Sequence, residues 1–343
     1  MSLPEGFELL PASPDPLPES FDRARDLDLL VIGDCNPDVL VLGGDVTPAF
    51  GQQEKLVDRI SLETGGSAAI TAVAAARLGL RVALLACVGA DAAGSFMLAE
   101  LAREGVDTSL VLSRSAEPTG MTVALSRGGD RAILTALGAI ASLTAVDIPA
   151  EAFRRTRHVH VSSYFLLADS LGPDLATVLA AARSAGAATS LDTNWDPSGR
   201  WRSDALSAAL AETALLLPNE AEALALSGAA DLDAAVASLS ARQPAGSRLA
   251  VKLGERGVLT ADGPVRHQIS LPAVTPVDTT GAGDCCNAGL IAGLLQDLPF
   301  TQAAALGCAA GALSTSALGG TAGAPGLLAA TDLASRATVR AVG

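Results

Sequence analysis

The chain has 343 residues, of which 49% are apolar and only 3% aromatic, so it can bury a large core of small aliphatic side chains. Its net charge of −14 argues against a nucleic-acid or anionic-membrane partner, because such partners need basic surface, but it does not exclude a small anionic substrate. No uninterrupted apolar run reaches the roughly 20 residues of a membrane span. The five cysteines, an odd number without CxxC spacing, favour a reducing, cytoplasmic compartment over a disulfide framework.

Residues 1–26 are rich in proline and acidic side chains, which predicts a loose N-terminal extension and no signal peptide. A single domain is expected over 27–343. Within it, two weaker β patterns lie over about 39–60 and about 119–139, the second with a Gly-Gly turn between alternating segments. We expect these two segments to form a small sheet outside the main core.

Strand and helix patterns alternate through most of the domain. Apolar strand patterns lie over 28–33, 82–86, 158–162, 188–192, 214–217 and 248–252, and helix patterns rich in alanine and leucine over 68–78, 94–104, 172–185, 204–211, 220–227 and 231–241. This alternation predicts a doubly wound α/β fold, with a mostly parallel sheet, right-handed crossovers and helices on both faces. Ligand sites in such sheets lie beyond the carboxyl ends of the strands.

The most informative stretch is the run Asp278-Thr279-Thr280-Gly281-Ala282-Gly283-Asp284, which precedes a long apolar segment. That segment predicts a buried helix, whose start offers unpaired N–H groups and the positive end of a dipole to an anion. The glycines allow a ligand to approach the backbone closely. A carboxylate beside an anion site would repel the anion, so Asp284 indicates a second role, such as accepting a proton from a nucleophile.

This run resembles the C-terminal signature of the PfkB, or ribokinase-like, family of carbohydrate kinases, and further segments over roughly 28–330 match that family in the same order. The resemblance implies a ribokinase-like fold whose small sheet acts as a β lid. It implies that Asp284 is the catalytic base and that the backbone of Gly281, Ala282 and Gly283 holds the transferred phosphoryl group. It also implies ATP and Mg²⁺ as cofactors, together with a monovalent cation such as K⁺.

On the nucleotide side, Asn219-x-x-Glu222 matches the family's N-x-x-E motif, in which the carboxylate positions Mg²⁺ partly through water. The same pair would also serve as ordinary helix capping. Lys252 stands where the family usually has threonine, and it either reaches a phosphate or points to solvent. The residues that the resemblance assigns to the nucleotide are Asn219, Glu222, Lys252, Gly254, Gly257 and Thr279.

On the acceptor side, a carboxylate that accepts two hydroxyl hydrogen bonds is a natural sugar ligand, and Asp38 fits that role. An Asx-Pro turn is the alternative interpretation of this segment. Ile70 departs from the family, which usually has asparagine there, and Arg131 either reaches the substrate or remains solvated. The residues that the resemblance assigns to the acceptor are Asn36, Asp38, Gly65, Gly66, Asp192 and Asn194.

The sequence therefore predicts an ATP-dependent kinase that phosphorylates a primary hydroxyl of a small sugar-like substrate. A nucleoside kinase of the same family is one alternative, and the low aromatic content argues mildly against it. A non-catalytic sugar or nucleotide sensor is a second alternative, but a sensor would not need Asp284. Exposed lid strands have free edges, so we also expect a homodimer formed through the lid, with neither nucleic acid nor membrane as a partner.

Overall fold

The computed structural model describes residues 25–127 and 130–342. Most of the expected N-terminal extension and the Gly128-Gly129 turn of the second β segment lie outside these residues. In the described part of the chain, no single helix is long and apolar enough to cross a membrane. The two helices over Glu220–Ser227 and Leu232–Ser240 meet that criterion only when taken together, across a bend of 64°.

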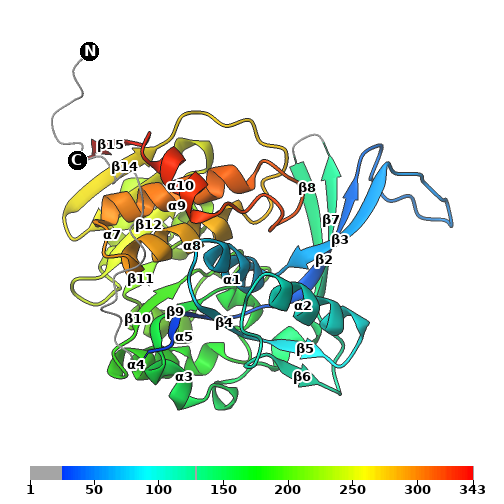
Figure 1. Cartoon of the computed structure of the whole chain (residues 1–343), viewed down its shortest axis with the longest axis horizontal. Coiled ribbons are helices and arrows are strands. Elements are labelled where there is room, and N and C mark those ends of the chain that lie inside the picture. Colours follow the sequence, from blue (N-terminus) through cyan, green and yellow to red (C-terminus); the bar gives the residue numbers. More distant parts are fainter. Residues whose placement is uncertain (1–24, 128–129, 343) are drawn as a thin grey trace.

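The body of the molecule is built on one large sheet (Figure 1). Its described strands lie in the order β15-β14-β13-β12-β11-β10-β9-β1-β4. Their bounds are β1 (Leu27–Ile32), β4 (Val82–Leu85), β9 (Thr156–Val161), β10 (Ala188–Leu191), β11 (Leu215–Leu216), β12 (Arg248–Lys252), β13 (Val258–Asp262), β14 (Val265–Ser270) and β15 (Thr338–Ala341). The strands from β12 through β11, β10, β9 and β1 to β4 pair in parallel. Strands β13, β14 and β15 add an antiparallel edge next to β12.

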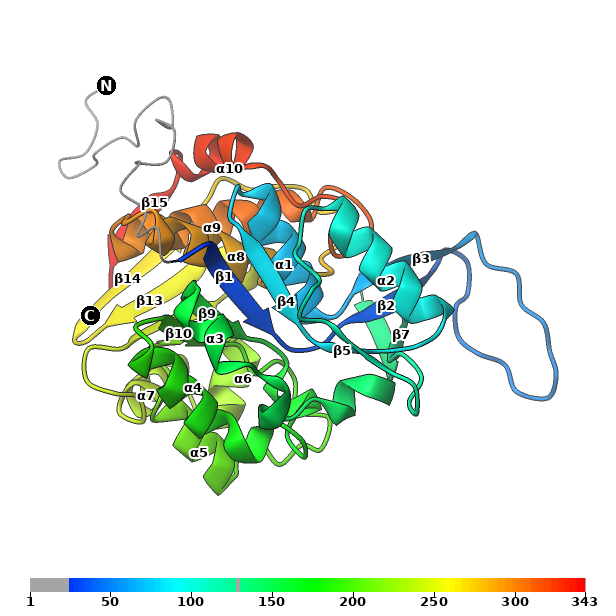
Figure 2. The same ribbon diagram turned by 60° about the horizontal axis from the view of Figure 1, so that its bottom comes forward.

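Helices cover both faces of this sheet, which confirms the predicted doubly wound fold (Figure 2). One face carries α1 (Ser67–Arg77), α2 (Ala92–Arg103), α8 (Ala282–Leu295), α9 (Phe300–Ser314) and α10 (Leu327–Ala334), and the other carries α3 (Ala150–Arg154), α4 (Leu175–Ser184), α5 (Asp204–Leu210), α6 (Glu220–Ser227) and α7 (Leu232–Ser240). Side chains alternate along β1, so Leu29 and Val31 join the first core and Leu30 and Ile32 the second.

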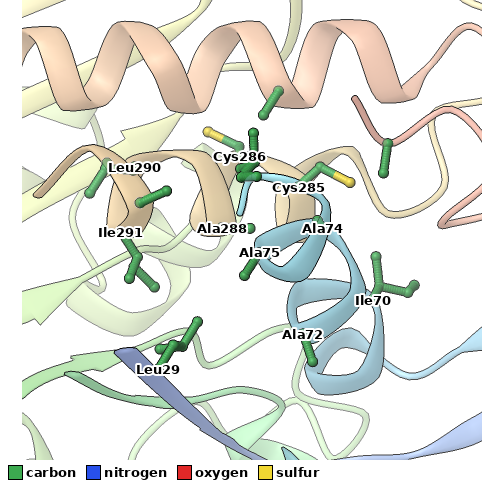
Figure 3. Close-up of a cluster of buried hydrophobic side chains, with 14 of the residues drawn as sticks. Leu29, Ile70, Ala72, Ala74, Ala75, Cys285, Cys286, Ala288, Leu290 and Ile291 are labelled. Carbon is green, nitrogen blue, oxygen red and sulfur yellow. The ribbon is translucent and has the colours of Figure 1, made fainter. Parts of the chain in front are cut away.

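Helix α8 is buried because small residues let its neighbours approach closely (Figure 3). A Cβ atom on Gly307 of α9 would lie 2.7 Å from the carbonyl oxygen of Cys286, and one on Gly311 would lie 2.7 Å from that of Ala282. Cys286 and Ala288 fill the seam between α8 and its neighbours. The signature run ends in the first turn of α8, so its last residues belong to a rigid element.

A second, four-stranded sheet stands at one end of the molecule, and we call it the small sheet (Figure 1). It has the order β3-β2-β7-β8, with β2 (Asn36–Leu42), β3 (Arg59–Gly65), β7 (Met121–Arg127) and β8 (Asp130–Ala136). Parallel pairing of β2 with β7 joins the two segments that the sequence predicted. The first segment differs from the expectation, because its strands begin at Asn36 and end at Gly65, with a long loop between them. Two short strands, β5 (Cys87–Gly89) and β6 (Leu112–Arg114), form a separate pair.

Candidate active site

A cavity of about 250 Å³ lies where the small sheet meets the carboxyl ends of β1, β9 and β10. Its walls come from the β1–β2 connection, the start of α1, the small sheet, the segments after β9 and β10, and the signature run. Residues more than 240 positions apart in the sequence therefore face the same space. Of the predicted site residues, those that line this cavity are Asn36, Asp38, Gly66, Asn194, Gly281 and Asp284.

Asn194 connects the two ends of this cavity through a hydrogen-bond network. Its backbone is left-handed, with φ 55°, and its Nδ2 donates to Ser67 Oγ at 2.6 Å and to Ser163 Oγ at 2.8 Å. Because both serine oxygens accept from the amide, their own protons are directed elsewhere: Ser67 bonds to the carboxylate of Asp284, and Ser163 to that of Asp34. The sequence analysis did not identify Ser67, Ser163 or Asp34 as site residues.

Asp34 holds the start of α1. Gly66, the residue before this helix, has no side chain to cap it, and Asp34 replaces the cap: its two oxygens accept from the N–H groups of Ser67 and Ala68, each at 3.0 Å. Burial raises the pKa of Asp34, although these hydrogen bonds oppose the shift. The sequence contained a signal for Asp34: it directly follows a buried strand, and the next predicted helix begins after a glycine, which cannot cap it.

Asn36 and Asp38 lie on strand β2, in extended backbone and not in the alternative Asx-Pro turn. Asn36 Nδ2 donates to Asp38 Oδ1 at 3.1 Å and to Thr122 Oγ1 of β7 at 3.2 Å. Burial and the neighbouring charge of Asp34 raise the pKa of Asp38 to about 7. A Cβ atom on Gly65 would lie 2.0 Å from Asp38 Oδ1, so this glycine makes room for the Asp38 carboxylate.

The signature run forms an open helix start at the far end of the cavity. Gly281 has φ 71°, and no side chain caps α8. Ala282 N–H donates to Thr279 O at 3.3 Å, whereas in the described residues the N–H groups of Gly281 and Gly283 have no acceptor. Asp284 is buried in the first turn of α8. Burial, followed by the charge of Asp192, raises the pKa of Asp284 well above its usual value.

The first carboxylate of the run, Asp278, organises the loop. Its Oδ1 accepts from Thr280 N at 2.9 Å and Thr280 Oγ1 at 2.7 Å, and its Oδ2 accepts from Gly319 N at 2.9 Å. Burial opposes its charge, but these hydrogen bonds hold the pKa of Asp278 below its usual value. Arg131 of β8 donates to Thr280 Oγ1 and lies 3.6 Å from Asp278 Oδ1. The small sheet is thus tied to the signature run through Arg131.

Lys252, at the end of β12, points into the protein. Its Nζ lies 2.5 Å from Asp192 Oδ2 and 3.2 Å from Asn287 Oδ1, and Asn287 Nδ2 donates to the same Asp192 oxygen at 2.6 Å. Burial works against the charge of Lys252, but Asp192 and Glu222 raise its pKa. A Cβ atom on Gly283 would lie 3.6 Å from Nζ. The sequence left open whether Lys252 points to solvent or reaches a phosphate. The structure excludes the solvent-facing orientation, because the ammonium group lies beside the open helix start.

Asn219 and Glu222 form the capping box that the sequence left as an alternative. Glu222 N donates to Asn219 Oδ1 at 2.9 Å, and Asn219 N donates to Glu222 Oε2 at 2.9 Å. Burial and the nearby charge of Asp192 raise the pKa of Glu222 to about 7, against the influence of Lys252. Among the described residues, no group of three or more His, Cys, Asp and Glu side chains is arranged to hold a metal. Such a group is not required by Mg²⁺, which keeps most of its waters and takes one or two carboxylates.

The two glycines after Lys252 have different surroundings. Gly254 has φ 61° and open space where a side chain would stand. Gly257 has φ 90°, and a Cβ atom there would lie 1.9 Å from the carbonyl oxygen of Ile269 on β14. The packing of β14 therefore requires Gly257 whether or not a nucleotide binds, while Gly254 leaves its backbone accessible. Thr279, the remaining residue assigned to the nucleotide, is exposed.

Ile70 is almost completely buried in the first turns of α1 and supports the glycine loops. Cβ atoms built on Gly320 and Gly281 would lie 2.4 Å and 3.0 Å from its side chain. Figure 3 shows Ile70 on α1, beside the first turn of α8. The residue that departs from the family pattern thus gives the cavity an apolar wall at this point.

Comparisons with known proteins identify the family of the chain. The model of the pfkB family of carbohydrate kinases matches residues 26–326. The chain is 31% identical to the ribokinase of Haemophilus influenzae (85% of this chain, 93% of that protein) and 32% identical to the fructokinase of Salmonella typhimurium (83% and 95%). It is also 31% identical to the 2-dehydro-3-deoxygluconokinase of Bacillus subtilis (78% and 86%). A solved structure of a putative ribokinase II from E. coli, in complex with ATP and Mg²⁺, matches with a TM-score of 0.79 at 24% identity over 90% of this chain and 99% of that one.

The fold and the signature run thus define a sugar kinase. The chain belongs to the PfkB family of carbohydrate kinases, as its resemblance to that family implied.

Proposed function

We propose that this enzyme transfers the γ-phosphoryl group of ATP to a primary hydroxyl of a small sugar, with Asp284 as the general base. One observation carries the proposal: a buried carboxylate stands at the end of a cavity, in the first turn of a helix at whose start the N–H groups of Gly281 and Gly283 are open. In the reaction, the acceptor oxygen bonds to the γ-phosphorus, the bond from phosphorus to ADP breaks, and the hydroxyl proton passes to Asp284.

The surroundings of Asp284 suit a base. Its raised pKa makes it a better proton acceptor than an exposed aspartate, and Ser67 bonds to its carboxylate, which fixes its orientation. The Ser67 proton is directed at Asp284 because Asn194 occupies the other side of the Ser67 oxygen. The acceptor hydroxyl would approach from the cavity.

The transferring phosphoryl group would lie at the start of α8. N–H groups of Gly281 and Gly283 and the positive end of the helix dipole face this position, and Lys252 adds a full charge beneath it. Of the two interpretations of Lys252, we therefore adopt the one in which its ammonium group contacts a phosphate. The rest of the nucleotide would run along Gly254, where the backbone is accessible.

For the metal, we propose that Glu222 and Asn219 hold Mg²⁺ through water, where its charge would neutralise the phosphates. The support is the raised pKa of Glu222, since a buried carboxylate with excess negative charge around it favours a cation. The putative ribokinase II that shares this fold contains ATP and Mg²⁺. The monovalent cation stays a prediction.

We also propose that the small sheet acts as a lid and that two copies of the chain pair through it, in a cytoplasmic homodimer. Leu134, Ile60 and Leu62 of this sheet are 63%, 64% and 46% exposed, and β3 and β8 are edge strands in the described chain. The five cysteines are free and buried, which suits a reducing compartment.

The test of the proposed function is ATP consumption with Mg²⁺ and a panel of sugars. Asp284→Ala should lose nearly all turnover, about 100-fold or more, because the acceptor proton has no base. It should still bind nucleotide, since the backbone and Lys252 remain. Wild-type-like rates in this variant would remove Asp284 from its assigned role. Preferred transfer to nucleosides would favour the nucleoside kinase, and sugar binding without ATP consumption would favour the sensor.

A further inference from the structure

Asn287 is a buried amide in an otherwise apolar helix. Among the side chains of α8, only those of Asp284 and Asn287 carry oxygen or nitrogen atoms. The two residues are three positions apart, so they lie on the same side of the helix, and Asn287 is 0% exposed. A buried amide costs free energy unless both its donor and its acceptor find partners. The partners of Asn287 therefore indicate its role.

Asn287 bridges the buried ion pair of Lys252 and Asp192. Its Nδ2 donates to Asp192 Oδ2 at 2.6 Å, and its Oδ1 accepts from Lys252 Nζ at 3.2 Å. Lys252 Nζ lies 2.5 Å from the same Asp192 oxygen. The amide has only one possible orientation here, because a carboxylate accepts hydrogen bonds and an ammonium group donates them. The three side chains form a closed triangle that joins α8 to the carboxyl ends of β10 and β12.

This triangle limits how the ammonium group of Lys252 can turn. An ammonium group has three donors, and Asp192 and Asn287 take two of them in fixed directions. Asp192 alone would leave Lys252 free to rotate about one hydrogen bond, since its other oxygen accepts from Asn194 N at 3.2 Å. Among the described residues, the third donor has no acceptor. It is available to a ligand at the start of α8, where a Cβ atom on Gly283 would lie 3.6 Å from Nζ.

Lys252 also has competing carboxylates around it. Burial lowers its pKa, but the charges of Asp192, Glu222 and Asp284 raise it overall, so all three attract the ammonium group. An ammonium group that turned toward Asp284 would stabilise the charged form of that carboxylate and make it a weaker base. Asn287 opposes this movement, because it holds Lys252 on the side of Asp192.

We propose that Asn287 is a positioning residue for phosphoryl transfer. It holds the Lys252 ammonium group so that one N–H faces the transferring phosphoryl group, while Asp284 stays free to accept the proton. This inference rests on the proposed function, in which Lys252 contacts a phosphate and Asp284 is the base. Asn287 acts through Lys252 and takes no part in the chemistry itself.

The first test is Asn287→Leu, which keeps the number of heavy atoms and removes both hydrogen bonds. With ATP, Mg²⁺ and the best sugar, kcat should fall about tenfold, as for the loss of one charge-assisted hydrogen bond. KM for the sugar should change little, because Asn287 does not line the acceptor cavity. An unchanged kcat in a folded Asn287→Leu protein would overturn the inference.

Gln243→Met is the matched control, because it also removes a buried amide with two hydrogen bonds. Gln243 is 9% exposed, and its Nε2 donates to Thr213 O at 3.1 Å and to Arg248 O at 3.2 Å, at the other end of β12 from Lys252. Both variants should unfold at lower urea concentration, but Gln243→Met should keep its kcat. Equal losses of kcat in the two variants would reduce Asn287 to a structural residue and refute its positioning role.

A double-mutant cycle shows whether Asn287 acts through Lys252. In a background of Lys252→Met with Asp192→Asn, adding Asn287→Leu should cost no further kcat, because no ammonium group remains to be oriented. The same tenfold loss in both backgrounds would contradict the proposal. If Asn287→Leu fails to fold, Asn287→Ser replaces it throughout, since its shorter hydroxyl cannot bridge both charged groups.

A binding measurement separates failure of this inference from failure of the proposed function. Calorimetry with a non-hydrolysable ATP analogue and with ADP needs no turnover. Asn287→Leu should weaken binding of the analogue several-fold and that of ADP little, because only the analogue has a γ-phosphoryl group for Lys252 to contact. Equal effects on the two nucleotides would refute the role of Asn287, whereas a wild-type protein that phosphorylates no sugar would refute the proposed function alone.

Discussion

At the scale of single residues, the site depends on polar side chains that act in pairs. Lys252 and Asp192 form the most buried ion pair described, with side chains 12% and 0% exposed. Burial pushes the pKa of Asp192 up, but Lys252 and Asn287 hold it below its usual value. Each charge is stable inside the protein because the other is present.

Lys252→Met should therefore destabilise the fold by about 3 kcal/mol, because it leaves Asp192 charged, buried and without its cation. Urea unfolding measures this loss. The double variant with Asp192→Asn should recover most of it, since neither charge is then buried. Arg336→Met is the control, because Arg336 and Asp332 are 60% and 65% exposed and such pairs contribute at most about 1 kcal/mol. Equal losses of unfolding free energy in Lys252→Met and Arg336→Met would contradict a larger contribution from the buried ion pair.

Asp38 should make the free enzyme less stable as the pH rises. Its pKa is 3.8 in an unfolded chain and about 7 in the fold, so between these values the folded state binds more protons than the unfolded state. Stability from this group is complete below about pH 4 and is lost as the pH rises through 7. Asp38→Asn should remove this dependence and raise Tm at pH 8. The comparison is the difference in Tm between the two proteins at pH 5 and pH 8, and a constant difference would contradict the shift.

The sequence predicted several of the residues that line the cavity, such as Asn36, Asp38 and Asp284, because each belongs to a local pattern after a strand or at a helix start. It did not predict Ser67 or Ser163. These serines have no local pattern, and they acquire a role only because β1, β9 and β10 are neighbours in the sheet, which brings their carboxyl ends to one place.

At the scale of elements, the repeating α/β part was the most predictable. The helix expected over 220–227 and the strand expected over 248–252 have those bounds in the structure. The small sheet was less predictable: the loop over 43–58 is not a strand, and pairing between β2 and β7 joins segments about 85 residues apart. Local patterns contain no information on such pairing, and β15 was missed for the same reason, because it pairs with β14 from about 70 residues further along the chain. The β13–β14 hairpin was also missed, although the Asp262-Gly263 pair at its turn is a local signal.

Arg131 should couple the small sheet to phosphoryl transfer. It contacts Thr280 and Asp278 of the signature run, so we expect it to act by positioning that run. Arg131→Gln should lower kcat/KM for the sugar about tenfold, the equivalent of one charge-assisted hydrogen bond, and should increase the share of ATP that is hydrolysed by water. Arg131→Lys should restore part of the coupling. Lys55→Gln, which removes a cation from the loop between β2 and β3, should leave both quantities unchanged.

The readout for Arg131 is the ratio of sugar phosphate formed to ATP consumed. A structural role alone would reduce both quantities together and keep the ratio constant. A constant ratio would therefore rule out Arg131 as the residue that couples closure to transfer.

At the scale of the whole molecule, the edges of the small sheet predict association. Sedimentation of the purified chain should give the mass of a dimer, because pairing covers Leu134 and Ile60. Leu134→Glu should shift the protein to a monomer by placing charge in the contact. The control is Leu328→Glu on α10, a 70% exposed position away from the small sheet, which should not alter the mass. A monomer in the unmodified protein would contradict the proposed pairing.

Strand β2 has a consequence for how this enzyme can evolve. It follows β1 after only Gly33, Asp34 and Cys35, it pairs with both neighbours in the small sheet, and it carries Asn36 and Asp38. In the proposed function, the same strand therefore binds the acceptor and connects the small sheet to the body of the protein. On this proposal, a substitution on β2 that changes which sugar is bound should also change how readily the small sheet opens to release product. New acceptor specificities are therefore expected to arise with altered turnover, and to need second changes in β7 or β8 to restore it.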